Sequence, residues 1–307
     1  MLFMDGEFIP AEQGFISVRT HAFAYGTGCF EGIRGYWNEE AQQVYLFRLR
    51  EHYERLQRSC KILRINLPFT VDQLVEQSIE LVRRNDQRQD VYLRPVAYKN
   101  EEIIGVRLEG VKDSYILTSE PMGNYVDIGG LKCGISSWRR IDDNALPARA
   151  KICGSYVNAA FAKTEALQNG FDEAIMLTHD GHVSEGSAEN IFLLINRQLV
   201  TPSPTENILL GITRDTVMRL APKELGLPVV ERQIDRTELY VADEIFLCGT
   251  GAQIAPVVSV DHSPVGNGNV GPLGQKLQDL YFDIVRGRKP EYLDWCTPVY
   301  SEVAAKR

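Results

Sequence analysis

The chain has 307 residues, of which 44% are hydrophobic and 24% are charged, values that fit a globular enzyme of one large or two moderate domains, and we expect two. The formal net charge of −8 argues against nucleic acid as a partner, because phosphate contacts need concentrated lysine and arginine. No stretch approaches the roughly 18 apolar residues that a membrane span needs. Asp5 and Glu7 stand where a signal peptide would need a basic end and an apolar stretch, so we expect a cytoplasmic protein without a membrane partner.

The first half of the chain, residues 1–120, has the pattern of a small α/β domain. The Asp5-Gly6 pair predicts a tight hairpin, because these residue types accept positive φ angles. Pro95 lacks an N–H donor, which pushes its strand toward a sheet edge or a bulge. The Pro and Gly content of residues 121–130 is typical of an interdomain linker. The other elements expected here are strands QVYLFRL, VYLRPVAY and SYILTSE and helices over 50–64 and 70–85.

The second half, residues 131–287, predicts a larger cofactor-binding domain, followed by a tail over 288–307 that is docked or disordered. Asp180-Gly181 and Asn196-Arg197 each predict the turn of a hairpin. A helix is expected from Thr213 to about residue 220, where Pro222 forces a break. Further expected elements are helices over 155–169 and 273–286, a short polar helix, and strands LKCGISSW, VVERQI, EIFLCGT and APVVSVD. Together the two halves give an α+β fold.

Cysteine and histidine spacing gives little support for a metal site or a hydrolase. His179 and His182 flank a turn at a spacing that suits metal, but Asp-Gly hairpins are normally surface loops, so we expect no metal. No histidine pairs with a Ser or Cys in a nucleophile motif. The six cysteines have no CxxC pair, which favours reduced, mostly buried thiols without disulfides: Cys29, Cys60, Cys133, Cys153, Cys248 and Cys296.

The segment from Lys151 to Asn190 contains the two chemical groups that a pyridoxal phosphate site needs. Lys151 stands among small residues, and a lysine that forms a Schiff base needs a partly desolvated pocket that keeps its amine neutral. Glu185 follows in a Ser-Glu-Gly turn. A carboxylate facing the pyridine nitrogen keeps that ring protonated, so that it accepts electrons.

Three further stretches are weak signals for a phosphate site when each is taken alone. The sequence LLGITRDT puts Ile212 and Thr213 in the first turn of a helix, where exposed N–H groups and the helix dipole favour anions. Most such helix starts are simply capped. Thr250 follows a buried strand in CGTGAQ, as in ordinary strand-ending turns. Arg55 lies at the boundary between the apolar and polar faces of its helix, where a solvated arginine is the more common case.

From about Tyr25 to Gly287 the chain resembles the fold type IV pyridoxal phosphate aminotransferases, and within them the branched-chain amino acid aminotransferases. The resemblance implies a two-domain α+β fold with the cofactor at the domain interface. FEGIR and YLRP favour the branched-chain group over D-amino acid aminotransferase and aminodeoxychorismate lyase. The matching stretches, in family order, are YGTGCFEGIR, FRLREHYERL, VYLRP, ARAKICGSYVNAA, VSEGSAENIF, GITRD and ADEIFLCGTGAQIAPV.

By this resemblance, Lys151 binds pyridoxal 5′-phosphate and moves the proton between the substrate Cα and the cofactor. Glu185 pairs with the pyridine nitrogen and Tyr156 with the phenolic oxygen. The implied phosphate ligands are Arg55, Ile212, Thr213 and Thr250, and Leu209 is a further implied cofactor-binding residue. The implied substrate pocket consists of Tyr25, Phe30, Arg34, Tyr92, Arg94, Tyr125, Thr250, Gly251 and Ala252.

The implied reaction is ping-pong transamination of leucine, isoleucine and valine with 2-oxoglutarate, giving branched 2-oxo acids and L-glutamate. Arg94 would meet the distal carboxylate of glutamate. Gly251 stands where the family usually has alanine, which loosens the carboxylate-binding turn and leaves D-amino acid or (R)-amine activity as an alternative. A non-catalytic binding protein is disfavoured, because a binder has no need of a Schiff-base lysine. The resemblance also implies a homodimer, with a hexamer as an alternative.

Overall fold

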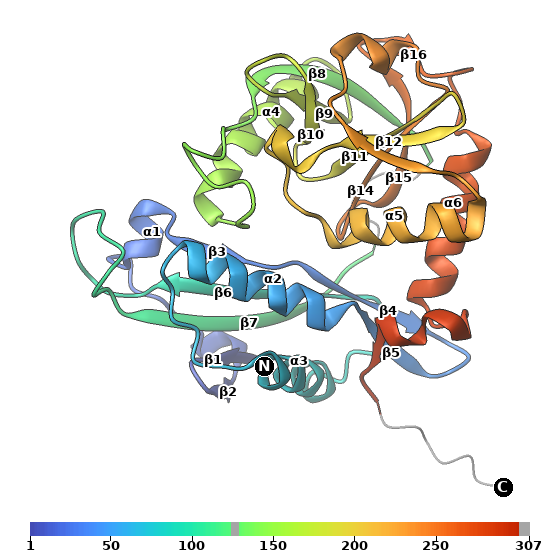
Figure 1. Ribbon diagram of the computed structural model, residues 1–307. Coiled ribbons are helices and arrows are strands. Elements are labelled where there is room, and N and C mark those ends of the chain that lie inside the picture. The colour runs from blue at the N-terminus through green and yellow to red at the C-terminus, as the bar shows by residue number, and fades with distance from the viewer. Residues whose placement is uncertain (124–128, 301–307) are drawn as a thin grey trace, which may run out of the picture. The chain divides into compact units, whose positions relative to one another are not determined.

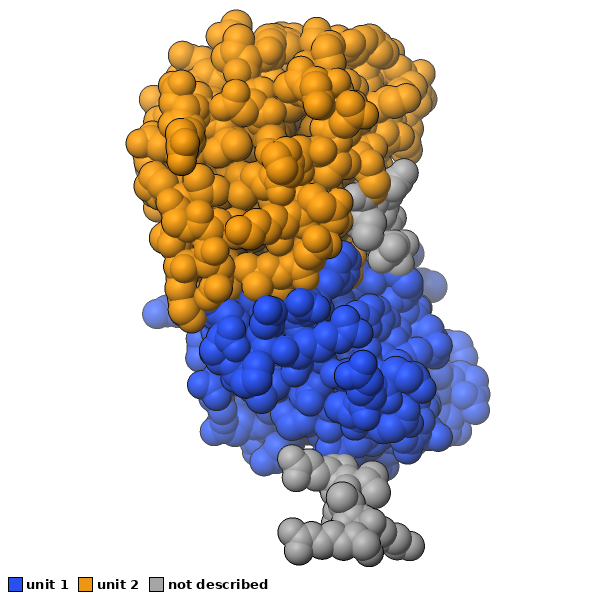
Figure 2. All heavy atoms as spheres, turned by 90° about the vertical axis from the view of Figure 1, so that its right-hand side faces the viewer, with its two compact units in different colours: residues 1–123, 150–154, 282–307 blue, residues 124–149, 155–281 orange. Residues whose placement is uncertain are grey.

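The computed structural model describes residues 1–123 and 129–300, which fall into two compact units (Figure 2). Unit 1 comprises residues 1–123, 150–154 and 282–307, and unit 2 comprises 124–149 and 155–281. This division assigns two segments differently from the domains expected above. The short segment that carries Lys151 and the end of the last helix belong to unit 1 rather than to a continuous second domain over 131–287.

Unit 1 contains an antiparallel sheet of eight strands in the order β17-β5-β4-β6-β7-β1-β2, with β3 also paired to β6 (Figure 1). The strands are β1 (Leu2–Met4), β2 (Glu7–Ile9), β3 (Gly28–Phe30), β4 (Ile33–Asn38), β5 (Gln43–Phe47), β6 (Val91–Lys99), β7 (Asp113–Pro121) and β17 (Cys296–Pro298).

Strand β6 lies inside this sheet, so the prediction that Pro95 places it at an edge is wrong. β6 pairs along its whole length with β7 on one side and with β3 and then β4 on the other. Opposite Pro95 the neighbouring strand is interrupted, because β3 ends at Phe30 and β4 begins at Ile33, so the missing N–H falls at a gap between these two strands. The carbonyl of Pro95 accepts the backbone N–H of Glu31 at 3.0 Å. The break therefore lies in the partner strand.

Two amphipathic helices of unit 1, α2 (Leu49–Ile62) and α3 (Val71–Arg84), match the predicted ones closely. Thr70 and Gln73 form a reciprocal capping box that starts α3, as the sequence pattern of such starts requires. The two helices pack against each other, and Tyr53 of α2 is hydrogen-bonded to Ser78 of α3. The inner face of α2 also buries polar side chains, which the candidate site uses.

The tail is docked as far as the structure describes it. A short 3-10 helix, η5 (Pro290–Trp295), leads into β17, which pairs with β5 so that Cys296 lies opposite Phe47. Residues 301–307 lie outside the described part of the chain. The remaining helical segments of unit 1 are η1 (Ala11–Gln13) and α1 (His21–Tyr25).

Unit 2 contains a nine-stranded mixed sheet in the order β10-β9-β8-β15-β14-β11-β12-β13, with β16 paired to β15. Its core consists of aliphatic side chains from these strands, including Ile191, Leu193, Leu247 and Ala255. The strands are β8 (Leu131–Arg139), β9 (Glu173–Leu177), β10 (Val183–Gly186), β11 (Asn190–Ile195), β12 (Gln198–Pro202), β13 (Val229–Arg232), β14 (Glu244–Gly249), β15 (Gln253–Val260) and β16 (Ser263–Pro264).

The predicted tight turns are confirmed. Asp5 and Gly6 have φ angles of 49° and 109° between β1 and β2, and Asn196 and Arg197 have 49° and 61° between β11 and β12. Gly181, with φ of 92°, lies in the turn between β9 and β10. Left-handed backbone favours Gly, Asn and Asp, which is why these short motifs predict turns without knowledge of the tertiary structure.

Helix α5 (Ile212–Leu225) runs through Pro222, so the predicted break at this proline is wrong. Val217, Leu220 and Ala221 are buried on its inner face, and this packing outweighs one lost backbone hydrogen bond. The helix ends instead at Gly226, whose φ of 63° forms the C-cap. The other helical segments are η2 (Cys153–Ser155), α4 (Tyr156–Gln168), η3 (Pro204–Glu206), η4 (Arg236–Tyr240) and α6 (Pro272–Val285). Among the described residues, no helix has both the length and the hydropathy that crossing a membrane requires.

Candidate active site

Lys151 lies in a short segment of unit 1 that is fixed through its backbone. Its N–H donates to Ser59 Oγ at 3.1 Å, and its carbonyl accepts the N–H of Phe30 at 3.0 Å. Gly154 donates to the carbonyl of Gly26 at 3.2 Å, and a side chain at Gly26 would lie 2.9 Å from the Cα of Gly154. The lysine is thus held against both β3 and α2.

Phe30 brings three of the predicted substrate residues together with the lysine. Lys151 Nζ lies 4.9 Å from the centre of the Phe30 ring, and the guanidinium of Arg94 lies 4.5 Å from it. Arg94 also donates to Tyr92 Oη at 2.8 Å. Gly32 permits this packing, because a Cβ there would lie 2.2 Å from the same hydroxyl. Two cations on one aromatic ring form a surface suited to carboxylates beside apolar groups.

Arg55 is buried and pairs with a carboxylate that the sequence reasoning missed. Its Nε and Nη2 donate to the two oxygens of Glu31, each at 2.7 Å, and His52 Nδ1 lies 2.9 Å from Glu31 Oε2. Glu31 is fully buried, while His52 and Arg55 are 2% and 5% exposed. His52, Arg55 and Ser59 follow at helical spacing on the inner face of α2, which is the sequence signal that could have found this cluster.

The pKa values of this cluster show how its charges are distributed. Burial alone would raise the pKa of Glu31, but the charge and hydrogen bonds of Arg55, together with His52, lower it to about 2. Burial lowers the pKa of His52, and the charges of Arg55 and Lys151 lower it further. The hydrogen bond and charge of Glu31 raise this pKa, but by less. An ionised carboxylate only accepts hydrogen bonds, so His52 donates from Nδ1. The cluster therefore holds an Arg⁺–Glu⁻ pair and a neutral imidazole.

The other predicted substrate residues of unit 1 have contacts of their own. Arg34 is 1% exposed and donates to the carbonyls of Met122 and Gly123 at 3.3 and 2.6 Å. Tyr25 Oη accepts the backbone N–H of Gly105 at 3.0 Å, which ties it to the loop after β6. Tyr125 lies outside the described residues.

In unit 2, Glu185 is held by three donors, of which the sequence reasoning named only Leu209. Arg140 Nη2 lies 2.8 Å from Oε1, while Asn190 Nδ2 and the backbone N–H of Leu209 lie 3.0 and 3.1 Å from Oε2. Arg140 also donates from Nε to the carbonyl of Asn207 at 3.1 Å. These donors therefore fix the orientation of both carboxylate oxygens of Glu185.

The start of α5 has the features of an anion site. Its N-cap is Gly211, which makes no capping hydrogen bond with a side chain, and Ile212 and Thr213 in the first turn are buried. A Cβ at Gly211 would lie 2.1 Å from Asn190 Oδ1, so only glycine fits beside the residue that holds Glu185. Leu209 lies two residues before this N-cap. Leu209, which binds Glu185, and the start of α5 therefore belong to the same loop.

Two predicted regions of unit 2 lie in a turn and at a helix start. Thr250, Gly251 and Ala252 form the turn that joins β14 to β15, and Ala252 is 2% exposed. Tyr156 is the first residue of α4. These positions agree with the elements expected from the sequence, and the roles of the residues remain predictions.

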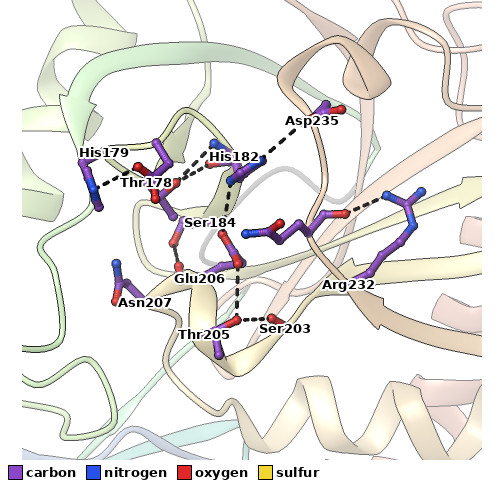
Figure 3. A network of polar contacts seen from close by, with 12 residues as sticks. Thr178, His179, His182, Ser184, Ser203, Thr205, Glu206, Asn207, Arg232 and Asp235 are labelled. Atoms are coloured by element: carbon purple, nitrogen blue, oxygen red, sulfur yellow. Dashed lines mark hydrogen bonds and ion pairs between the residues drawn. The ribbon is translucent and has the colours of Figure 1, made fainter.

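Figure 3 shows the polar network that surrounds the hairpin of His179 and His182 in unit 2. His179 lies 3.2 Å from Asp142, and His182 lies 3.6 and 3.9 Å from Asp235 and Glu206. Ser184, next to Glu185, donates to the carbonyl of Glu206 at 2.6 Å. Within residues 1–123 and 129–300, no group of three or more His, Cys, Asp or Glu side chains has the geometry of a metal site.

A buried acidic pair in unit 2 was also missed. Glu173 and Glu189 are 2% and 5% exposed, and Lys163 pairs with Glu173 at 2.6 Å. Burial, together with the charge of Glu173, raises the pKa of Glu189 to about 8. No sequence pattern links these two glutamates, because they come from β9 and from the turn before β11.

All six cysteines are free thiols, with Cys29 and Cys60 Sγ 3.4 Å apart.

Comparison with protein families and curated proteins identifies the family of the chain and several relatives. Residues 28–260 match the model of the class IV aminotransferases. A probable branched-chain-amino-acid aminotransferase of Aquifex aeolicus is 47% identical over 98% of this chain and 97% of its own length. The branched-chain-amino-acid aminotransferase of Pseudomonas aeruginosa is 38% identical over 97% of both.

Solved structures give the same result. The branched-chain aminotransferase of Thermoproteus uzoniensis with norvaline is 42% identical, with a TM-score of 0.94 over 97% of this chain and 99% of that one. The Thermobaculum terrenum enzyme in its pyridoxal phosphate form is 40% identical, with a TM-score of 0.93 over 98% of both chains. These matches show that the chain is an enzyme of the class IV aminotransferase family, related over nearly its whole length to branched-chain amino acid aminotransferases.

Proposed function

We propose that this protein is a pyridoxal phosphate-dependent aminotransferase that transfers the amino group of leucine, isoleucine or valine to 2-oxoglutarate. The observation that carries the proposal is the arrangement around Phe30, where an amine, a guanidinium and aromatic side chains meet. The names of the relatives above describe them as branched-chain amino acid aminotransferases, and one solved relative is in its pyridoxal phosphate form.

The donor set of the chain fits this cofactor. Lys151 supplies the amine that binds its carbonyl carbon, and Glu185, with both oxygens already fixed, supplies the carboxylate for its ring nitrogen. Arg55 and the start of α5, where Gly211 provides no side-chain cap, supply donors for its phosphate. Tyr156, Leu209 and Thr250 complete the set by family resemblance. When bound, the cofactor supplies an electron sink for the carbanion that forms at the substrate Cα.

The protein's own residues bind and orient the substrate and move the proton. Phe30 and Tyr92 offer apolar surface to a branched side chain, whose full burial contributes roughly 1.5–3 kcal/mol. Arg94, stacked on Phe30, meets the distal carboxylate of glutamate or 2-oxoglutarate. With the cofactor bound, Lys151 would move the proton from the substrate Cα to the cofactor in the first half-reaction, and from the cofactor to the Cα of the newly formed amino acid in the second. One pocket serves both substrates in turn.

A panel of amino donors with 2-oxoglutarate tests the proposal. We expect turnover with valine, leucine and isoleucine, and little with D-alanine or an (R)-amine. Preference for D-alanine or the amine would assign the enzyme to another class IV activity. Lys151→Ala should abolish transamination and the visible absorbance of the bound cofactor, and substantial residual turnover would contradict the role of the lysine.

We further propose that the chain forms at least a homodimer through two adjacent segments of unit 1, residues 18–25, which include α1, and residues 101–106. His21 joins them, because its N–H donates to the carbonyl of Glu101 at 3.0 Å and its Nε2 lies 2.8 Å from the carbonyl of Gly105. Apolar side chains on these segments are largely exposed, namely Val18 (81%), Phe23 (70%), Ile104 (99%) and Val106 (78%). Light scattering should show a dimer that Ile104→Asp dissociates and the control Val241→Asp, at a 73% exposed site of unit 2, leaves intact.

A further inference from the structure

Three consecutive residues at the break between β3 and β4 serve three different partners. Phe30 contacts Lys151 Nζ, Glu31 binds Arg55, and Gly32 makes room for the Tyr92 hydroxyl. The side chain of Glu31 reaches α2 from the interrupted pairing opposite Pro95, where its backbone N–H is already bound. The fold therefore brings a buried carboxylate to the arginine that we assign to the cofactor phosphate.

Glu31 binds the arginine that we assign to the phosphate, although the negative charge of a carboxylate repels that anion. The geometry of the pair accounts for its presence. Two parallel hydrogen bonds of 2.7 Å fix the plane of the Arg55 guanidinium, and His52 fixes the carboxylate in turn. A buried arginine without its counter-ion is strongly unfavourable, so without Glu31 nothing would hold the guanidinium in this plane when the cofactor is absent.

We propose that Glu31 is a positioning residue that holds Arg55 in the orientation required to bind the cofactor phosphate, with His52 orienting Glu31. This inference rests on the proposed function, since it takes Arg55 as a phosphate ligand. The gain in orientation exceeds the repulsion between the carboxylate and the phosphate. The anion site is therefore already assembled in the protein before the cofactor binds.

The test compares the affinities of the cofactor-free full chain for pyridoxal phosphate and for pyridoxal, which lacks the phosphate. The ratio of these affinities isolates the phosphate contribution from any general loosening of the site. We expect Glu31→Gln to lower the ratio at least tenfold, because glutamine cannot accept both charge-assisted bonds. His52→Gln should lower it by a smaller factor. Glu31→Asp keeps the charge but shortens the reach, and should give an intermediate ratio if the Gln variant does not fold.

Asp113→Asn is the matched control, because Asp113 pairs at 2.8 Å with Lys99, a side chain that is equally buried in unit 1. It should reduce stability while leaving the ratio unchanged. The inference is overturned if the Glu31 variants keep the ratio within twofold, bind pyridoxal phosphate more tightly, or change it no more than Asp113→Asn. Arg55→Gln tests whether Arg55 binds the phosphate at all. If this variant also leaves the ratio unchanged, Arg55 is not a phosphate ligand and the proposed function loses that residue, independently of the role of Glu31.

Discussion

Glu31 in unit 1 and Glu189 in unit 2 are both deeply buried carboxylates, yet their pKa values move in opposite directions. Burial raises the pKa of each, but Arg55 and His52 outweigh it at Glu31 and lower its pKa to about 2, while Glu173 adds to it at Glu189 and raises its pKa to about 8. A deeply buried carboxylate therefore stays ionised only where neighbouring cations and donors outweigh the effect of burial. At neutral pH one unit therefore contains a buried ion pair and the other a buried neutral acid.

The largest expected effect is the loss of stability on Glu31→Gln. The substitution leaves the guanidinium of Arg55 buried without its counter-ion, which costs about 3–5 kcal/mol. Urea unfolding of the parent and the variant at pH 7 measures this difference. A variant within 1 kcal/mol of the parent would show that Arg55 finds water or another partner, and the contrast between the two units would disappear.

The pH dependence of Glu31 has a definite sign. Its folded pKa lies below its unfolded value, so its contribution to stability is complete above pH 4.5 and is lost as the pH falls toward about 2. The parent should therefore lose stability on acidification through this window, and Glu31→Gln should show a flatter profile. Equal slopes for both proteins would contradict the lowered pKa.

Glu189→Gln should have the opposite profile and a smaller effect. The folded pKa of Glu189 lies above its unfolded value, so its contribution is complete below pH 4.5 and is lost as the pH rises through about 8. Above pH 8 the variant should be more stable than the parent, by on the order of 2 kcal/mol, because no charge has to be buried. Thermal unfolding between pH 5 and pH 9 measures the difference, and a variant that loses stability at alkaline pH would show that Glu189 is ionised and paired.

Glu173→Gln tests the origin of the raised pKa. Without the negative charge of Glu173, the pKa of Glu189 should fall but stay above its usual value, because burial is the larger cause. The alkaline loss of stability should then become smaller and be complete at a lower pH, whereas Glu189→Gln should remove it altogether. Titration of the carboxyl groups by infrared spectroscopy would detect the change directly, and an unchanged titration would leave burial as the only cause.

The smallest effect is expected at an exposed pair. Glu80 and Arg84 lie 2.7 Å apart on α3, with 41% and 46% of their side chains exposed. Glu80→Gln should change stability by no more than about 0.5 kcal/mol, and less at high salt, since solvent screens such pairs. A larger effect would mean that pairing matters irrespective of burial, which would weaken the comparison of Glu31 with Glu189.

Much of this protein follows from its sequence alone. Short-range patterns determine the hairpins at Asp5 and Asn196, the capped start of α3 at Thr70, and the amphipathic α2, because turn and helix preferences depend on residues close in the chain. The ordered motifs around Lys151 and Glu185 identify the class IV family, which the comparisons confirm.

Only the tertiary structure decided which distant side chains meet. Strand order places β6 inside its sheet despite Pro95, and packing carries α5 through Pro222, because many buried contacts outweigh a local preference. Glu31 lies 24 residues from Arg55 in sequence. Arg140, just after β8, and Asn190, at the start of β11, both bind Glu185. The pairing of buried charges depends on strand register and helix placement, which no local pattern encodes.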